Sequence, residues 1–136
     1  NNMTFVGMDE LLRNADIVTI HCALTPETRN LINAETLGLM KNGAILINTA
    51  RGEIVDPVAV ADALKSGQLS FAALDVHAQE PIPEDYPLKN IDNVILTPHI
   101  AGVTADSFRA MMHDAFRNID CFDKGELDTI APYRYL

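Results

Sequence analysis

The chain has 136 residues, of which 48% are hydrophobic and 21% are charged, as is usual for one globular domain. Ten Lys and Arg residues against nineteen Asp and Glu residues give a formal net charge of −9, which makes nucleic acid a poor partner because the protein would repel its phosphates. No apolar run approaches the ~20 residues of a membrane span. Cys22 and Cys121 lack metal-type spacing and are expected to be free thiols. These features predict a cytoplasmic protein with no membrane, nucleic-acid or metal partner.

Short apolar segments alternate with segments of helical spacing, starting near the N-terminus. Asp9 is the predicted cap of a short first helix that ends before Asp16. Residues 17–20 follow as a β-branched strand candidate. Asn33 is the predicted cap of the next helix, which Gly43 ends.

The same alternation continues through the middle of the chain. Residues 44–47 are a second strand candidate. Asp56 followed by Pro57 predicts a helix start, and Gly67 predicts the stop. Residues 71–74 are a weaker strand candidate.

The last third of the chain contains a rigid loop, a strand and a long helix. Residues 81–87 are too rich in proline for a helix or strand, whereas residues 94–96 form a clear strand candidate. A final helix is predicted from Thr104 to about Asp123, with Gly125 as its stop. Its apolar positions have i, i+3 and i+4 spacing: Phe108, Met111, Met112, Ala115, Phe116 and Ile119.

The pattern as a whole predicts an α/β fold. Strands that read as continuous apolar runs indicate burial on both faces, which is typical of parallel sheets covered by helices. We therefore expect part of a Rossmann-type doubly wound parallel sheet with flanking helices. In such sheets ligands bind at the carboxyl ends of the strands. The segments that follow the four predicted strands are residues 21–25, 48–52, 75–77 and 97–99.

Arg51 is the first candidate functional residue, because a guanidinium at the end of a buried strand is costly unless it meets an anion. Its planar fork suits a carboxylate. The alternative is a salt bridge to a nearby acid, either Glu53 or Asp56.

A second group of candidates follows the last two strands. His99, between Pro98 and Ile100, has the side chain that most often transfers protons near neutral pH. Glu80 matters if it reaches His99, because a carboxylate beside an imidazole favours the charged ring. Asp75 either accepts a hydrogen bond from a ligand amide or caps the turn that follows it. The other histidines, His21, His77 and His113, are weaker candidates, although His21 is placed to line a cofactor crevice.

At this point several segments, in register, resemble one family. Residues 48–56, NTARGEIVD, resemble the arginine motif of the D-isomer-specific 2-hydroxyacid dehydrogenases. Residues 73–81, ALDVHAQEP, resemble their acidic motif, and residues 97–102, TPHIAG, their histidine motif. Residues 15–22 and 25–28 fit as well, so the resemblance covers nearly the whole chain.

The resemblance implies reversible hydride transfer between a nicotinamide cofactor and a small 2-keto or 2-hydroxy acid. His99 would be the acid/base, Glu80 would hold its ring, Arg51 would bind the substrate carboxylate, and Asp75 would accept a hydrogen bond from the nicotinamide carboxamide. NAD is the expected cofactor, NADP is the alternative, and no metal is required. The residues that would bind the cofactor are Cys22, Ala23, Leu24, Thr49, Ala50, Arg51, Asp75, His99 and Gly102.

The chain departs from the family pattern in one large respect. None of its seven glycines forms a Gly-x-Gly-x-x-Gly turn, and we find no acidic residue placed to bind the adenosine ribose. We therefore expect residues 1–136 to be one unit, the second half of a dinucleotide-binding domain, without the glycine-rich first half or the substrate domain. Such a fragment would be inactive alone, and its open sheet edge would favour a homodimer.

Two alternatives remain at the level of the sequence. Some relatives of these dehydrogenases are nucleotide-sensing corepressors, so a binding module without turnover is one alternative. The other is a structural α/β fragment of a different doubly wound protein, which requires the motif matches to be chance.

Overall fold

The computed structural model describes residues 3–127 and residue 130, in two compact units that meet in the sequence between Ile100 and Ala101. The described part of the second unit contains helix α4 (Ala105–Asp123). The elements of the first unit are, in chain order, α1 (Met8–Asn14), β1 (Ile17–Ile20), α2 (Ala34–Leu39), β2 (Ala44–Asn48), the 3-10 helix η1 (Gly52–Ile54), α3 (Pro57–Ser66), β3 (Leu69–Leu74) and β4 (Val94–Leu96).

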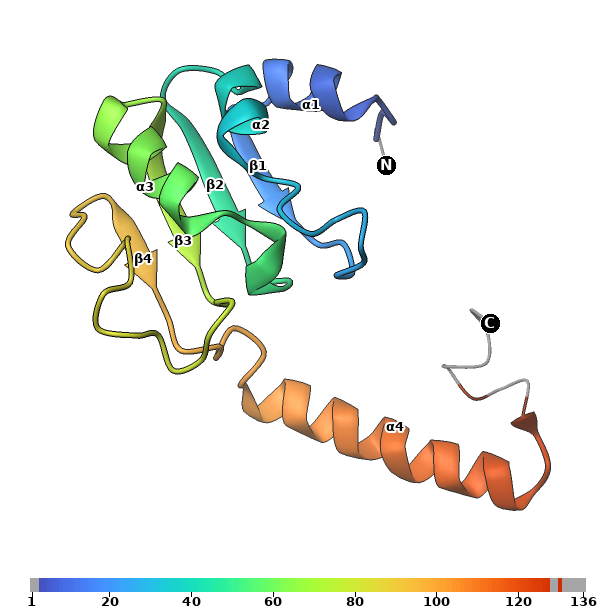
Figure 1. Cartoon of the computed structure of the whole chain (residues 1–136). Helices are drawn as coiled ribbons and strands as arrows, with labels where there is room; N and C mark the ends of the chain where they lie inside the picture. The colour runs from blue at the N-terminus through green and yellow to red at the C-terminus, as the bar shows by residue number, and fades with distance from the viewer. Residues whose placement is uncertain (1–2, 128–129, 131–136) are drawn as a thin grey trace. The chain divides into compact units, whose positions relative to one another are not determined.

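The four strands form one parallel sheet in the order β1-β2-β3-β4 (Figure 1). Its register pairs Ile20 with Asn48, Asn48 with Leu74, and Leu74 with Leu96. The last residues of all four strands therefore lie side by side, and the loops that follow them start from one edge. The predicted α/β class with a parallel, Rossmann-like sheet and flanking helices is confirmed.

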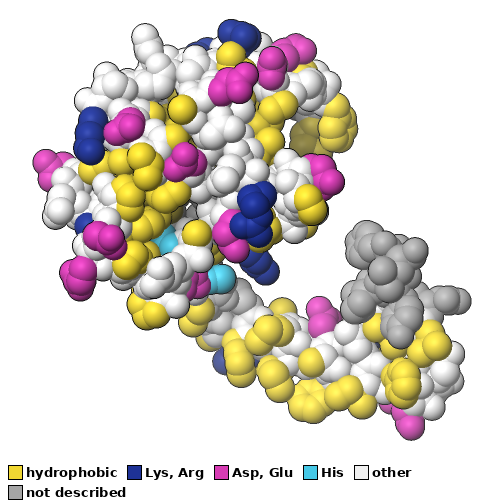
Figure 2. Space-filling view, viewed as in Figure 1, with side chains coloured by type: hydrophobic (Ala, Val, Ile, Leu, Met, Phe, Trp, Pro, Cys, Tyr) yellow, Lys and Arg dark blue, Asp and Glu magenta, His cyan; other side chains and the backbone are white. Residues whose placement is uncertain are grey.

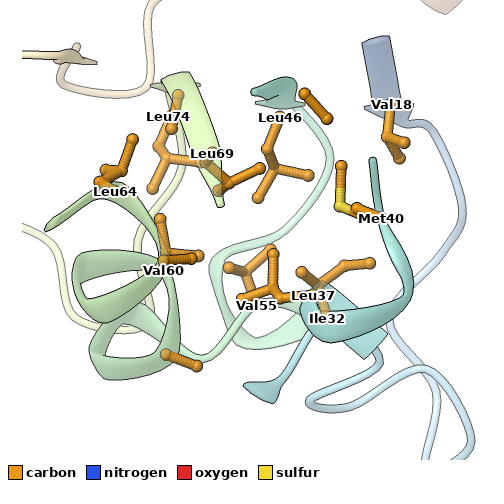
Figure 3. Packing of buried hydrophobic residues seen from close by; sticks show 14 of the residues in the cluster. Val18, Ile32, Leu37, Met40, Leu46, Val55, Val60, Leu64, Leu69 and Leu74 are labelled. Atoms are coloured by element: carbon orange, nitrogen blue, oxygen red, sulfur yellow. The ribbon is translucent and has the colours of Figure 1, made fainter. Parts of the chain in front are cut away.

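The hydrophobic core lies between the sheet and the helices α2 and α3. Val60 and Leu64 of α3 face Leu69 and Leu74 of β3, and Leu46 of β2 lies beside them (Figure 3). The strands bury alternate residues, as in the pattern of β1, where Val18 and Ile20 are buried. On the opposite face Ile17 is 56% exposed and Ile95 is 51% exposed. The sheet was predicted to be buried on both faces. Among the described residues it is buried on one face, and the prediction is wrong for the other.

Local chemistry explains where the helices of the first unit begin and end. Asn33 caps α2 by accepting from the backbone N–H groups of Glu35 and Thr36, and Asp56 caps α3 in the same way. Gly67 ends α3 in the left-handed conformation, with φ of 81°. The cap predicted for α1 is wrong: the N-cap is Gly7, and Asp9 lies in the first turn, where its charge still suits the positive end of the helix.

The strand bounds follow the predictions closely. The predicted ranges 17–20 and 94–96 are confirmed, β2 extends one residue further to Asn48, and β3 begins two residues earlier, at Leu69. The proline-rich segment 81–87 is a loop as predicted.

The long predicted helix is confirmed as α4, capped by Thr104, whose hydroxyl accepts from the backbone N–H of Ser107. Gly125 follows it with φ of 74°. Hydrophobic side chains are visible along this helix (Figure 2). In the part of the chain that the structure describes, no helix has both the length and the apolar character to cross a membrane.

Candidate functional site

Three of the loops that follow the strands are joined by backbone hydrogen bonds at the carboxyl edge of the sheet. The N–H of Asp75 donates to the carbonyl oxygen of Asn48 at 3.0 Å, and the N–H of His99 donates to the carbonyl oxygen of Asp75 at 2.8 Å. The segments after β2, β3 and β4 therefore start from fixed positions relative to one another. These are the segments that carry Arg51, Glu80 and His99.

The turn that carries Arg51 is fixed by hydrogen bonds to Asn48, whose side chain is fully buried. The Asn48 Oδ1 accepts from the N–H of Ala50 at 3.0 Å, and its Nδ2 donates to the carbonyl oxygen of Arg51 at 2.9 Å. Both ends of the amide are thus used to shape this turn. No role for Asn48 is predicted from the sequence; a polar residue at the last position of a buried strand is the signal that could have indicated one.

The Arg51 side chain is exposed, and its Nη1 donates to the carbonyl oxygen of Ala50 at 2.6 Å. Within residues 3–127 and 130, neither Glu53 nor Asp56 forms an ion pair with it. The carboxylate of Asp56 instead caps α3. The salt-bridge alternative for Arg51 therefore finds no support, and the guanidinium is accessible to an anion.

Asp75 is buried and holds the loop that leads to His99. Its Oδ1 accepts from the hydroxyl of Thr97 at 2.5 Å and from the backbone N–H of Ile100 at 2.8 Å. Its carboxylate thus bonds to the chain on both sides of His99, and these two partners lie in the segment after β4, not in the turn that follows Asp75. Its role toward a nicotinamide stays a prediction.

His99 and Glu80, which are 19 residues apart in the sequence, form a direct pair. The Nδ1 of His99 lies 2.9 Å from the Oε2 of Glu80. Because a carboxylate only accepts, Nδ1 carries the hydrogen, and Nε2 is left as the nitrogen that would face a substrate. His99 has φ of 56°, a left-handed conformation that is uncommon for a residue with a side chain and clusters at functional sites.

Glu80 is fixed from its other side by the main chain. Its Oε1 accepts from the backbone N–H of His77 at 2.9 Å. This bond, followed by the bond from the His99 ring, lowers the pKa of Glu80 from its ordinary value. Glu80 therefore remains an ionised acceptor for the imidazole at neutral pH.

His77, which the sequence analysis ranked low, is a buried part of the same structure. Its Nε2 lies 3.0 Å from the carbonyl oxygen of Thr97, so this nitrogen carries the hydrogen, and its Nδ1 lies 3.1 Å from the hydroxyl of Tyr86. Burial raises the pKa of Tyr86. His77 thereby joins the Glu80 loop to the end of β4. Its spacing in the sequence gave no signal of this contact.

Two pockets open at this edge of the sheet. The first, of ≈ 340 Å³, lies beside Glu80 and is mostly apolar, lined by His77, Glu80, Pro81, Ile82, Leu96, Thr97 and Pro98. The second, of ≈ 420 Å³, is lined by His21, Cys22, Ala23, Leu24, Thr49, Ala50 and Arg51. The second pocket is lined by six of the residues predicted to bind cofactor, and His21 lines it as well.

The structure thus brings the predicted site residues into two neighbouring groups. Residues 22–24 and 49–51 share a pocket, and Glu80 and His99 form a pair. Gly102 belongs to the second compact unit, and its predicted role stays a prediction. Among the described residues, no three His, Cys, Asp or Glu side chains gather as a metal site would require.

Open parallel α/β sheets bind their ligands at the carboxyl ends of the strands, which is where this chain carries the His99 imidazole, the Glu80 carboxylate and the Arg51 guanidinium. The sequence model of the family described as "D-isomer specific 2-hydroxyacid dehydrogenase, NAD binding domain" matches residues 1–101. The chain belongs to this family.

Individual relatives agree with the family match. A glyoxylate reductase of Thermofilum pendens is 51% identical over 126 residues, which are 93% of this chain and 37% of that protein. A D-isomer specific 2-hydroxyacid dehydrogenase of Xanthobacter autotrophicus, solved with NADPH, is 41% identical with a TM-score of 0.78 over 87% of this chain and 48% of that one. The D-lactate dehydrogenase of Lactobacillus jensenii, solved with NAD⁺, is 38% identical with a TM-score of 0.82 over 90% and 41%. The chain therefore spans less than half the length of these relatives.

Proposed function

We propose that the protein is an oxidoreductase that transfers a hydride between NAD(P)H and a small 2-keto acid, to give the 2-hydroxy acid. The observation that carries this proposal is the pair between His99 Nδ1 and Glu80 Oε2, beside the turn that presents Arg51. Reduction of a keto acid needs a proton donor, a carboxylate anchor and an oriented hydride donor. The chain's own side chains supply the first two.

The contacts of the three residues support the proposed roles. His99 would give a proton from Nε2 to the ketone oxygen, while Glu80 accepts from Nδ1 and so orients the ring and stabilises its charged form. Arg51 would bind the substrate carboxylate through its planar fork and place positive charge near the carbonyl. In the reverse direction His99 takes the proton from the hydroxyl.

The second pocket fits part of a dinucleotide. Its volume of ≈ 420 Å³ lies within the usual range of about 300–1,000 Å³ for ligand pockets. Cys22, Ala23, Leu24, Thr49 and Ala50 would line the nicotinamide end, with Asp75, His99 and Gly102 completing the predicted set. When bound, the nicotinamide supplies the hydride. NAD is the proposed cofactor and NADP the alternative, since relatives solved with either are similar to this chain.

The comparisons also bear on the two alternatives left open by the sequence. The relatives named above are reductases and dehydrogenases, which supports an enzyme and gives the corepressor-type module no support. The family match over residues 1–101 leaves no room for a chance match to an unrelated fold.

The proposal extends to the organisation of the protein. We propose that residues 1–136 are the second half of a dinucleotide-binding domain, whose glycine-rich half and substrate domain lie outside this chain. The length of the relatives supports this. The homodimer also belongs to the proposal, supported by the edge position of β1 in the sheet. A strictly monomeric intact protein in sedimentation velocity would contradict the dimer. Cytoplasmic location is proposed on the two free cysteines, Cys22 and Cys121.

The test is oxidation of NADH and NADPH, followed by absorbance, with the intact protein and a panel of 2-keto acids. Turnover is expected, and His99→Gln is expected to lower kcat by about 100-fold or more, since general acid–base catalysis contributes roughly 10²–10⁴-fold. His113→Gln, an exposed histidine on α4, is the matched control and should retain full activity. Equal activity of wild type and His99→Gln would contradict the assignment of the acid.

A further inference from the structure

Gly52 lies where two loops of the site touch through their backbones. It is buried, and a Cβ added to it would overlap the carbonyl carbon and Cα of His77 and the backbone nitrogen of Ala78. Its φ is outside the left-handed region, so space, not backbone conformation, requires glycine here. Since the atoms in the way are backbone atoms, no rotation of a neighbouring side chain would make room.

Each of these two loops carries one part of the proposed site. Gly52 directly follows Arg51, whose carbonyl oxygen is held by the buried amide of Asn48. On the other side, the N–H of His77 donates to Glu80, so the residue that packs on Gly52 is also the residue that fixes Glu80.

The contact therefore lies within a continuous series of short links. Arg51 is bonded covalently to Gly52, Gly52 packs on His77, His77 donates to Glu80, and Glu80 accepts from the His99 ring at 2.9 Å. Two backbone hydrogen bonds, from Asp75 to the Asn48 carbonyl oxygen and from His99 to the Asp75 carbonyl oxygen, also fix where these loops leave the sheet. The separation between the Arg51 guanidinium and the His99 imidazole therefore depends on how closely the loop that carries Gly52 approaches the loop that carries His77.

We propose that Gly52 is a positioning residue, whose backbone contact with His77 and Ala78 sets the spacing between the Arg51 carboxylate anchor and the Glu80–His99 proton donor. This inference rests on the proposed function. A 2-keto acid has its carboxylate and ketone on adjacent carbons, so the two protein groups must meet atoms a fixed short distance apart. A methyl group at position 52 forces the loops apart and misplaces His99 relative to a substrate still anchored at Arg51.

A purely structural role for Gly52 predicts a different result from a positioning role. Loss of packing alone lowers the free energy of unfolding but leaves the folded fraction with its normal kinetic constants. Misplacement of the proton donor lowers kcat, whereas KM changes little because the anchor at Arg51 remains. A shift of about 1 Å in a reacting group can cost about 100-fold in rate.

The experiment compares Gly52→Ala with Gly38→Ala in the intact protein, with NADH and a 2-keto acid that the wild type reduces. Gly38 is exposed in α2, and a Cβ there meets nothing within 4 Å, so it is a matched control. Both variants are assayed under conditions in which circular dichroism shows them folded. We expect kcat of Gly52→Ala to fall by about 100-fold with KM little changed, and Gly38→Ala to match the wild type. A folded Gly52→Ala with wild-type kcat overturns the proposal, whatever its KM.

A second measurement needs no variant. Because a hydrogen on the Gly52 Cα occupies the direction of the missing Cβ, it should show a strong nuclear Overhauser effect to the N–H of Ala78 in the wild type. If Gly52→Ala does not fold, the nuclear Overhauser effect in the wild type is the deciding test. Its presence supports the backbone contact, and its absence overturns the proposal. If the wild type reduces no 2-keto acid, the proposed function is contradicted, and the same measurement still decides whether the contact exists.

Discussion

Replacing Asn48 with alanine tests the local structure that presents Arg51. The substitution removes two hydrogen bonds, of 3.0 Å from the Ala50 N–H and 2.9 Å to the Arg51 carbonyl oxygen, from a side chain with 0% exposure. Each bond contributes a net ~0.5–1.5 kcal/mol, and a partner left unsatisfied in the interior costs more. Water can reach the exposed Arg51 but only partly the half-buried Ala50. The expected loss of unfolding free energy is therefore about 2 kcal/mol.

Urea unfolding followed by circular dichroism measures this loss. With a slope of about 1–3 kcal/mol per molar urea, the midpoint should fall by roughly 1 M. Asn90→Ala, at an exposed asparagine, is the control and should change stability by no more than about 0.5 kcal/mol. In the intact protein, Asn48→Ala should also raise KM for the keto acid, because the Arg51 turn loses its support. A midpoint and a KM equal to those of the wild type would refute the reasoning.

Three further predictions concern the core, a helix cap and a titrating group. Leu46→Ala, at a side chain with 0% exposure, should lower the unfolding free energy by about 2–5 kcal/mol in urea titrations, and a loss similar to that of an exposed residue would contradict the described packing. Asp56→Ala removes the cap of α3 and should cost about 1 kcal/mol, whereas Asp56→Asn should retain most of it; equal losses would exclude the cap. The pKa of Glu80 is lowered in the folded state. The ionised carboxylate therefore contributes to stability at pH values above the ordinary pKa of a glutamate, and this contribution is lost as the pH falls through the lowered pKa. The stability difference between wild type and Glu80→Gln should therefore shrink as the pH falls through that range, and a pH-independent difference would contradict the described bonds.

The sequence was a good guide to elements whose signals are local. Asn33, Asp56 and Gly67 mark helix ends by side-chain or backbone chemistry that acts within a few residues, and all three were placed correctly. Local reasoning is weaker where two nearby residues could both be the N-cap of a helix. Gly7 is the N-cap of α1, and Asp9 lies in its first turn. The start of β3 was missed because Ser70 interrupts the apolar run. The Ser70 hydroxyl donates to the carbonyl oxygen of Gly43, so this polar side chain has a hydrogen-bond partner within the sheet.

The site was predicted from different information than the fold. The contact between Glu80 and His99 joins residues 19 positions apart; residue chemistry raised it only as a condition, and the family resemblance made it an expectation. Asn48, Gly52 and His77 lay inside the matched motifs, but their roles depend on burial and on contacts across loops, which residue spacing does not reveal.

The most direct test of the central claim follows the transferred hydrogen when the intact protein reacts with a 2-keto acid and NADH or NADPH that carries deuterium at both positions of carbon 4 of the nicotinamide. The proposed function predicts a D-2-hydroxy acid with deuterium at carbon 2, and a much smaller yield from His99→Gln under the same conditions. Absence of deuterated product across the panel of keto acids, with either NADH or NADPH as donor, would contradict hydride transfer as the function of this site.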